Sequence, residues 1–151
     1  MEEALQIDWF CKSFNELSNI ELYAILQARN EVFILEQCCP YQDIDGKDQA
    51  SLHLCAWHNK VLVAYCRLLP PGLSYKEASI GRVLCKARYR RTGLGIILIE
   101  KAVQTIEQQF KQKHIKISAQ LYLKSFYEKF GFRQCSEPYL EDEIPHIKMS
   151  L

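Results

Sequence analysis

The sequence contains no excess of charge of either sign. Its 19 lysine and arginine residues are balanced by 18 aspartate and glutamate residues, so the formal net charge is +1. A near-neutral chain lacks the broad basic surface on which bulk nucleic-acid binding depends, and no nucleic-acid partner is expected. A long hydrophobic run is missing as well. The longest one, around residues 96–99, is far too short to span a bilayer, so no membrane partner is expected.

Cysteine is plentiful, but the pattern of a metal site or a disulfide framework is missing. The chain has seven cysteines, an odd number, without a Cys-x-x-Cys pair. Cys38 and Cys39 are adjacent and have no second pair or nearby histidine, so no metal is predicted. Cys55 and Cys66 lie in apolar runs, where a thiol behaves as a small buried side chain. The acidic N-terminal stretch also lacks the apolar segment of a secretory signal, and a cytoplasmic location is expected.

Nucleotide-binding signatures are absent, since neither Gly-x-Gly-x-x-Gly nor Gly-x-x-x-x-Gly-Lys-Ser/Thr occurs. Internal repeats, linkers and low-complexity segments are missing too. What remains is a chain of 151 residues that is 48% apolar and 25% charged, the composition of an ordinary globular domain. One domain covering residues 1–151 is the simplest organisation.

Hydrophobic periodicity predicts a chain in which strands and helices alternate. Ser18 and Glu21 form a capping box at the start of a first helix, which should end at Phe33 or Leu35, before Pro40. The other expected helices cover residues 93–110 and 123–130, and the expected strands are 5–10, 52–57, 61–69, 77–85, 114–119, 132–135 and 147–151. The order is β-α-βββ-α-β-α-ββ, an α/β sheet with helices packed on its faces.

A loop at residues 39–49 contains proline, glycine and three aspartates, Asp43, Asp45 and Asp48. The spacing is similar to the opening of a calcium loop, but the glutamate that should follow the glycine is missing. We expect the three aspartates to be solvated turn residues. The loop is also a candidate wall for a cationic substrate, as is the acidic turn at residues 141–143.

The most informative stretch joins a strand to a helix through a basic turn. Residues 86–92 carry lysine and arginine, and Gly93 and Gly95 then open the helix. The first backbone N–H groups of a helix lack partners and lie at the positive end of its dipole, and glycine lets an anion approach them closely. A pyrophosphate site is therefore predicted at this turn. A simple turn with solvated arginines is the alternative.

Two sequence blocks carry a family resemblance. Residues 90–95, Arg-Arg-Thr-Gly-Leu-Gly, match the signature Gln/Arg-x-x-Gly-x-Gly/Ala, and residues 119–132 begin with Ala-Gln and end in Phe-Tyr-Glu-Lys-Phe-Gly-Phe. In this order they resemble the GNAT superfamily of acyl-CoA-dependent N-acetyltransferases, over nearly the whole chain. The resemblance implies an α/β fold with a mixed, largely antiparallel twisted sheet and helices on both faces. It also implies acetyl-CoA as the acyl-donor cosubstrate.

Four further segments are similar to the ElaA-like branch of that superfamily: residues 33–37, 39–46, 80–83 and 144–147. The branch implies no settled acceptor. The expected reaction moves an acetyl group from acetyl-CoA to a primary amine, of a small molecule or a peptide, by direct attack on the thioester. A non-catalytic regulatory domain that binds acyl-CoA is the alternative. The edge strands and the C-terminal hairpin are compatible with a homodimer.

The resemblance also implies site residues. In such enzymes the strand before the turn supplies backbone groups to the pantetheine arm and the acetyl carbonyl, and Gln120 stands where asparagine commonly contacts the cofactor. Tyr127 is expected to hydrogen-bond to the leaving thiolate. Glu36 and His53 are the preferred candidates for the base, ahead of His146, with a structural role as the alternative for each. The implied cofactor-binding residues are Val83, Leu84, Cys85, Arg90, Arg91, Thr92, Gly93, Leu94, Gly95, Ile96 and Gln120.

Overall fold

The computed structural model describes residues 5–151. Within these residues, three α-helices and eight strands are joined by loops and short helical turns. The helices are α1 (Asn19–Arg29), α2 (Leu94–Phe110) and α3 (Lys124–Glu128), and the strands are β1 (Asp8–Ser13), β2 (Leu52–His58), β3 (Val61–Leu69), β4 (Ser79–Cys85), β5 (Lys116–Gln120), β6 (Arg133–Gln134), β7 (Tyr139–Glu141) and β8 (Ile144–Ser150).

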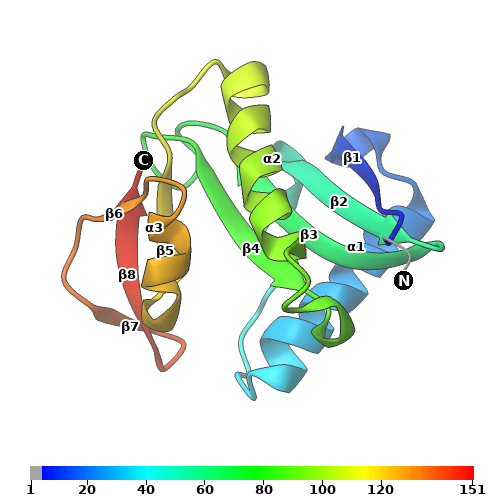
Figure 1. Cartoon of the computed structure of the whole chain (residues 1–151), viewed down its shortest axis with the longest axis horizontal. Coiled ribbons are helices and arrows are strands. Elements are labelled where there is room, and N and C mark those ends of the chain that lie inside the picture. The colour runs from blue at the N-terminus through cyan, green and yellow to red at the C-terminus, as the bar shows by residue number, and fades with distance from the viewer. Residues whose placement is uncertain (1–4) are drawn as a thin grey trace.

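The strands form two antiparallel groups that splay apart (Figure 1). One group has the order β1-β2-β3-β4, and the other has the order β5-β8-β6 with β7 also paired to β8. The groups meet at a single parallel bridge between Ala78 and Ile115, beside which the Lys116 N–H donates to the Ala78 carbonyl at 2.9 Å. Beyond this bridge β4 and β5 separate, so one edge of β4 has no strand partner. The predicted mixed, largely antiparallel sheet is confirmed.

Local sequence signals account for the element boundaries. The Ser18 side chain accepts from the Glu21 N–H at 3.1 Å, and the Glu21 carboxylate accepts from the Ser18 N–H at 2.8 Å. This capping box starts α1 as predicted. The helix continues into a π-helical segment, Asn30–Glu36 (η2), and so ends before proline, close to the predicted end. Asn59 and Lys60 both have positive φ, +47° and +64°, which suits the tight turn between β2 and β3.

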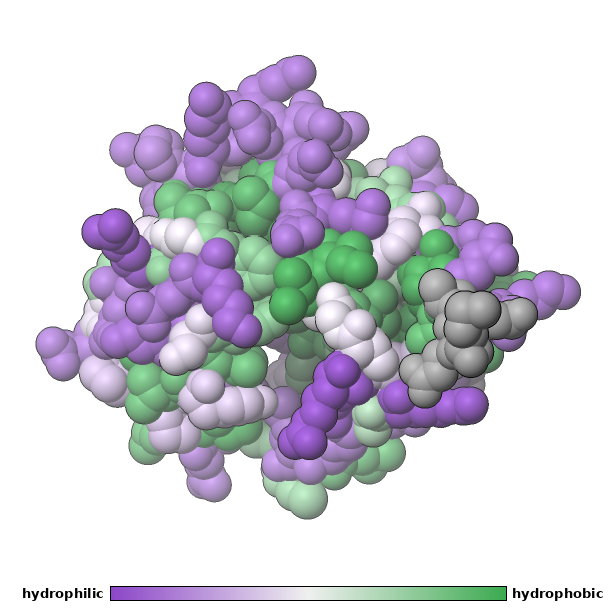
Figure 2. Space-filling model, viewed as in Figure 1, coloured by the Kyte–Doolittle hydropathy of each residue, from purple (hydrophilic) through white to green (hydrophobic). Residues whose placement is uncertain are grey.

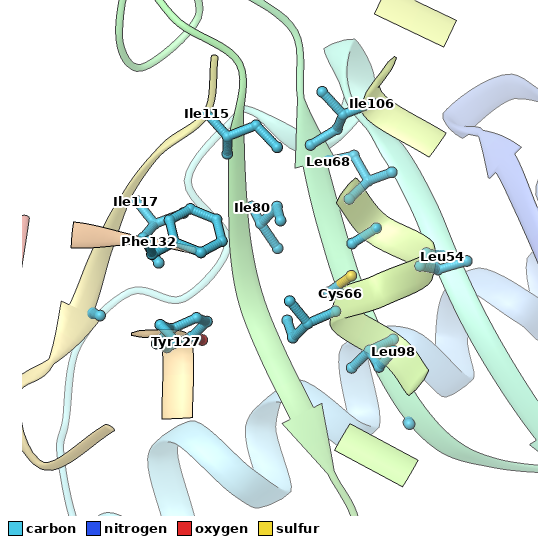
Figure 3. Packing of buried hydrophobic residues seen from close by; sticks show 14 of the residues in the cluster. Leu54, Cys66, Leu68, Ile80, Leu98, Ile106, Ile115, Ile117, Tyr127 and Phe132 are labelled. Atoms are coloured by element: carbon cyan, nitrogen blue, oxygen red, sulfur yellow. The ribbon is translucent and has the colours of Figure 1, made fainter. Parts of the chain in front are cut away.

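Two hydrophobic clusters lie on opposite faces of the first sheet. On one face, α2 buries Leu98, Ile99 and Ile106 against β3 and β4, and the same cluster continues to Tyr127 and Phe132 beside β5 (Figure 3). On the other face, the cluster is formed mainly by residues of α1, β2 and β3. The helices therefore cover both faces, as expected, and the larger core connects the two groups of strands at the base of the splay.

Several predicted boundaries differ from the structure. The first strand begins at Asp8 rather than residue 5 and extends to Ser13, because all six residues pair with β2. The strand predicted at 114–119 begins at Lys116, the one predicted at 132–135 is reduced to Arg133–Gln134, and β7 was not predicted. It is only three residues long, too short for an alternating pattern. No helix within residues 5–151 is long and apolar enough to cross a membrane.

Candidate active site

The gap between β4 and β5 is a cavity of about 1130 Å³, lined by residues of both groups of strands. Figure 2 shows the molecule hollowed between them. The glycine turn before α2, the free edge of β4, α3, the loop after η2 and the hairpin of β7 and β8 all contribute to its wall. A smaller cavity of about 230 Å³ near Cys11 and Gln109 shares no lining residue with this cleft.

A β-bulge shapes the edge of β4 that faces the cleft. Two residues of β4, Arg82 and Val83, lie opposite one residue of β3, and Arg82 has a left-handed backbone with φ of +51°. The bulge shifts the alternation of side chains between the two faces of the sheet. Ile80 and Val83 pack in the cluster on the α2 face (the α2-side cluster), whereas Leu84 packs in the cluster on the α1 face (the α1-side cluster). Val83, Leu84 and Cys85 all line the cleft, and their strand lacks a partner on that side. Backbone donors and acceptors are therefore available along this edge.

The glycine turn presents the start of α2 to the same cleft. Gly93 has φ of +86° and is the N-cap of the helix, and the Ile97 N–H is the first to bond back, to the Gly93 carbonyl at 3.3 Å. The N–H groups of the first helical turn are therefore without helical partners. A methyl group at Gly95 would lie 3.8 Å from Cys85 Sγ and Phe126 Cζ, an ordinary contact. Packing within the described residues therefore does not require glycine at this position.

The predicted cofactor residues of this turn do not all face the cleft. The lining of the cleft includes five of the seven predicted residues at 90–96, but neither Thr92 nor Leu94. The Thr92 hydroxyl donates to the Tyr89 carbonyl at 2.6 Å and stabilises the turn. The Leu94 side chain is buried in the α2-side cluster, so only its backbone could bind a ligand. The residues of this stretch that line the cleft are Arg90, Arg91, Gly93, Gly95 and Ile96.

The two arginines of the turn differ in what they contact. Arg90 Nε donates to the Cys85 carbonyl at 2.9 Å, and its Nη2 donates to the Glu36 carboxylate at 2.6 Å. Arg90 therefore connects η2, β4 and the turn, and its charge is compensated. Among residues 5–151, Arg91 has no ion-pair partner within 4.0 Å and borders the cleft beside the helix N-terminus. Arg91 and the unpartnered backbone N–H groups thus lie together at the cleft, an arrangement that suits an anion.

Tyr127 and Gln120 approach the cleft from the second group of strands. The Tyr127 ring is 6% exposed and packs edge-on against Phe126 and Phe132. Burial raises the pKa of its hydroxyl, and in the described part of the chain the hydroxyl has no hydrogen-bond partner. Tyr127 is therefore a protonated phenol at the cleft wall. Gln120 lines the cleft at the end of β5, directly opposite His146 on β8.

Of the two preferred base candidates, one lies in the cleft and one does not. Glu36 lines the cleft but is bound to Arg90. His53 is fully buried, its Nδ1 is 2.7 Å from the Tyr65 hydroxyl, and its Nε2 is 2.9 Å from the Asp48 carbonyl. The carbonyl can only accept, so Nε2 carries the proton and Nδ1 accepts from Tyr65. Burial also lowers the pKa of this imidazole. The prediction of His53 as a base is therefore wrong, because neither nitrogen can reach a substrate.

His146, the third candidate, lies in the cleft with a carboxylate beside it. Its Nδ1 donates to the Ile144 carbonyl at 2.7 Å, which fixes the tautomer and leaves Nε2 as the nitrogen with the lone pair in the neutral ring. Nε2 is 3.3 Å from the Glu141 carboxylate, which also accepts a hydrogen bond from Ser118 at 3.2 Å. The ring stacks on Tyr139. Strand β7, which was not predicted, places Glu141 next to His146. A prediction of this strand would have pointed to the pair.

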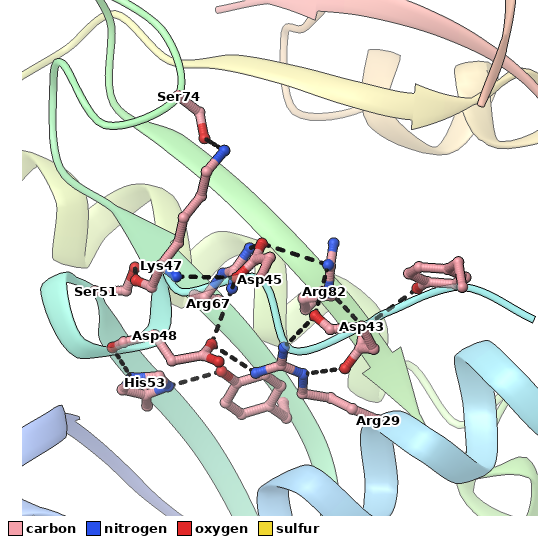
Figure 4. Close-up of polar contacts among 12 residues, drawn as sticks. Arg29, Asp43, Asp45, Lys47, Asp48, Ser51, His53, Arg67, Ser74 and Arg82 are labelled. Atoms are coloured by element: carbon pink, nitrogen blue, oxygen red, sulfur yellow. Dashed lines mark hydrogen bonds and ion pairs between the residues drawn. The ribbon is translucent and has the colours of Figure 1, made fainter. Parts of the chain in front are cut away.

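The expectation that the loop aspartates are solvated is wrong for Asp43 and Asp48, whereas Asp45 is exposed. Asp43 and Asp48 are 9% and 5% exposed, and all three aspartates form ion pairs with arginines (Figure 4). Each arginine contacts two aspartates and each aspartate contacts two arginines, so three positive and three negative charges close a ring. These charges compensate one another, and the loop does not present the acidic wall that a cation would need. We call these residues the charge ring: Arg29, Asp43, Arg82, Asp45, Arg67 and Asp48.

The splayed sheet, the bulged free edge and the helix N-terminus beside it together define an acyltransferase of the kind that uses acyl-CoA. The acetyltransferase (GNAT) domain matches residues 20–151, and the chain belongs to this family. It is 41% identical over 146 residues to Protein ElaA of Escherichia coli, with 95% of each chain covered. The crystal structure of E. coli ElaA aligns with a TM-score of 0.91 at 40% identity, covering 96% of this chain and 99% of ElaA.

A second solved structure agrees with this assignment. The structure described as an acyl-CoA N-acyltransferase from Pseudomonas aeruginosa aligns with a TM-score of 0.90 at 45% identity, covering 95% of this chain and 98% of that one. A protein of Schizosaccharomyces pombe, UPF0039 protein C11D3.02c, is 39% identical over 147 residues. Both structural alignments extend over both groups of strands, so the cleft between them belongs to the shared fold.

Proposed function

We propose that this protein transfers an acetyl group from acetyl-CoA to a primary amine by direct attack on the thioester. One observation carries the proposal. A single cleft connects the N-terminus of α2 with His146 and Glu141, and the free edge of β4 lies between them. The similar P. aeruginosa protein is described as an acyl-CoA N-acyltransferase, which supports an acyl-CoA donor. The cysteine pattern of the sequence supports a cytoplasmic setting.

The donor is bound mainly by backbone. In this proposal the N–H groups at residues 94–96 and the Arg91 guanidinium hold the diphosphate. The pantetheine arm lies along β4 as an additional strand would, and the Val83 N–H donates to the thioester oxygen. Arg90 and Glu36 position the turn through their ion pair, so Glu36 is not assigned as the base.

His146 is the proposed base, and Tyr127 is the proposed hydrogen-bond donor to the leaving group. His146 Nε2 takes a proton from the ammonium form of the acceptor, and Glu141 stabilises the imidazolium that results. The free amine lone pair then forms a bond to the carbonyl carbon, the C–S bond breaks, and the second amine proton passes to solvent. The leaving thiolate accepts a hydrogen bond from Tyr127, which the raised pKa keeps protonated, and is then protonated by solvent. Gln120, opposite His146, completes the wall between donor and acceptor.

A panel of small amines and lysine-containing peptides, incubated with acetyl-CoA while free CoA is detected, tests the proposal. Turnover of an amine with a mass gain of one acetyl group is the expected result. Tight binding of acetyl-CoA without turnover of any amine would support a regulatory acyl-CoA-binding domain instead. Release of CoA that persists in Gly93→Asp would contradict the assigned diphosphate site, because a carboxylate at the N-cap would repel that group.

A further inference from the structure

The charge ring connects a loop to three elements of the fold. The aspartates come from the loop after η2, and their partners come from α1, β3 and β4 (Figure 4). Arg29 bonds Asp43 at 2.7 Å and Asp48 at 2.6 Å and is fully buried. From there the ring extends toward the cleft, where the side chains of Asp45 and Arg82 are 23% and 22% exposed. The ring thus links the α1 side of the core to the cleft edge.

Stability alone is a weak explanation for such a ring. Burying charges costs desolvation energy that their attraction only partly offsets, and well-packed apolar side chains of similar volume are often as stable. Directional contacts, by contrast, fix geometry. Arg67 contacts both Asp45, at 2.7 Å, and Asp48, at 2.9 Å, so neighbouring aspartates of the loop are held in register with β3. The charge ring therefore fixes the position of the loop relative to β3.

Among the ring residues, Arg82 alone has a left-handed backbone. That conformation is unfavourable for any residue with a Cβ and persists where the surroundings impose it. The surroundings here are the Asp43 carbonyl, which accepts from Arg82 Nη2 at 2.9 Å, and the Asp43 carboxylate, 2.7 Å from Nε. The contact between Nε and the Asp43 carboxylate is an ion pair whose geometry does not align as a hydrogen bond. Asp43 is in turn fixed by Arg29.

We propose that the charge ring is a positioning device, in which Asp43 holds Arg82 in the bulge conformation and thereby aims the Val83 N–H at the carbonyl of the bound thioester. Arg82 is then a positioning residue that acts through the backbone of its neighbour. This inference rests on the proposed function. It differs from a purely structural role because it concerns the backbone angle at residue 82, which can be tested separately from the side chain.

Alanine and glycine at position 82 separate the two roles. Both remove every contact of the guanidinium, but glycine adopts positive φ freely and alanine does not. We expect Arg82→Ala to lower kcat about tenfold while Arg82→Gly retains most of it, since a left-handed alanine is disfavoured by about that factor. A stabilising role alone would change the free energy of unfolding of the two variants but leave kcat of the folded enzymes equal. Equal rates, or a lower rate for glycine, would overturn the proposal.

Binding of two CoA thioethers tests the aim of the Val83 N–H without turnover. Acetonyl-CoA carries a ketone one methylene away from the sulfur, and S-propyl-CoA has the same chain length without the oxygen. Calorimetry should show that wild type prefers acetonyl-CoA, that Arg82→Gly keeps this preference and that Arg82→Ala loses it. Lys12→Ala, which breaks the distant pair with Glu21, is the matched control and should behave as wild type. If Arg82→Ala does not fold, Arg82→Met replaces it, since any residue with a Cβ meets the same penalty.

The binding results distinguish the positioning role of Arg82 from the proposed use of acetyl-CoA. If wild type binds both thioethers and Arg82→Ala keeps the preference, the positioning role fails and acetyl-CoA binding stands. If wild type binds neither thioether, acetyl-CoA is not the donor, and the proposed function and the positioning role are both overturned.

Discussion

The two halves of the cleft differ in the chemical groups that form them. The donor half, on the α2 side, consists of residues 83–96 with Tyr127, and its predicted contacts are backbone groups exposed by a bulge and a helix start. The acceptor half, on the α1 side, consists of the loop at 39–48 and the hairpin at 139–146, joined where Cys39 Sγ donates to the Asp142 carbonyl at 2.9 Å. Its geometry is set by charged side chains. The donor half should therefore tolerate most side-chain changes, and the acceptor half should be sensitive to single charges.

The largest expected effect is on stability, from breaking the charge ring. Asp48→Asn leaves Arg29 and Arg67, both buried, without one partner each, and the free energy of unfolding should fall by about 3–5 kcal/mol. Urea denaturation measures this change. Lys12→Ala removes a partly exposed ion pair and should cost no more than about 1 kcal/mol. Equal losses in the two variants would show that the ring contributes no more than a surface pair.

The ring also makes a prediction about pH. Burial alone would raise the pKa of Asp48, but its hydrogen bonds to Arg29 and Arg67 outweigh this and lower the pKa. A lowered folded-state pKa gives stability that is fully present above the ordinary carboxyl pKa of about 4 and is lost as the pH falls below it. Wild type should therefore lose stability on acidification more steeply than Asp48→Asn. If the free energy of unfolding fell equally with pH in both proteins, the pairing of Asp48 with Arg29 and Arg67 would be contradicted.

The next effect should appear in donor binding. Gly93→Asp puts a carboxylate at the N-cap of α2 at φ of +86°, and the affinity for acetyl-CoA should fall on the order of a hundredfold, because like charges in contact cost several kcal/mol. Gly72→Asp is the matched control. Gly72 has φ of +90°, has open space around its Cα and does not line the cleft. Calorimetry with acetyl-CoA should find the Gly72 variant unchanged; equal weakening would attribute the loss to backbone strain.

A change in the acceptor half should leave donor binding intact. His146→Gln removes the proposed base, and kcat/KM for the amine should fall about a hundredfold. His58→Gln serves as the control, since His58 does not line the cleft. Initial rates with the amine varied at saturating acetyl-CoA measure this change. A His146→Gln variant with the kcat/KM of wild type would remove His146 from the proton path.

The two halves also differ in how well the sequence predicts them. The donor half is local: the strand, the basic turn and the glycines that open α2 are consecutive, so a pattern within residues 79–110 was sufficient to predict them. The acceptor half depends on pairs far apart in the chain, such as Asp43 with Arg82, and no periodicity reports such a pair. One signal was available. Arg29 occurs among the apolar residues of the α1 stripe, and a charge buried there requires a counter-charge.

The smallest effect is expected from removing one hydroxyl, and it provides a matched test of both halves. Tyr127→Phe should lower kcat about tenfold or less, because a hydrogen bond to the thiolate is one contribution among several. Stability should hold, since the hydroxyl has no partner within residues 5–151. Tyr65→Phe should do the reverse: its hydroxyl donates to His53 at 2.7 Å in the buried region beside the charge ring, so unfolding should become easier by about 1–3 kcal/mol while kcat holds. The same chemical change would then act on turnover at the cleft wall and on folding in the core. A Tyr127→Phe enzyme with unchanged kcat and intact acetyl-CoA binding would show that the phenol only packs, and that protonation of the thiolate needs no side chain of the donor half.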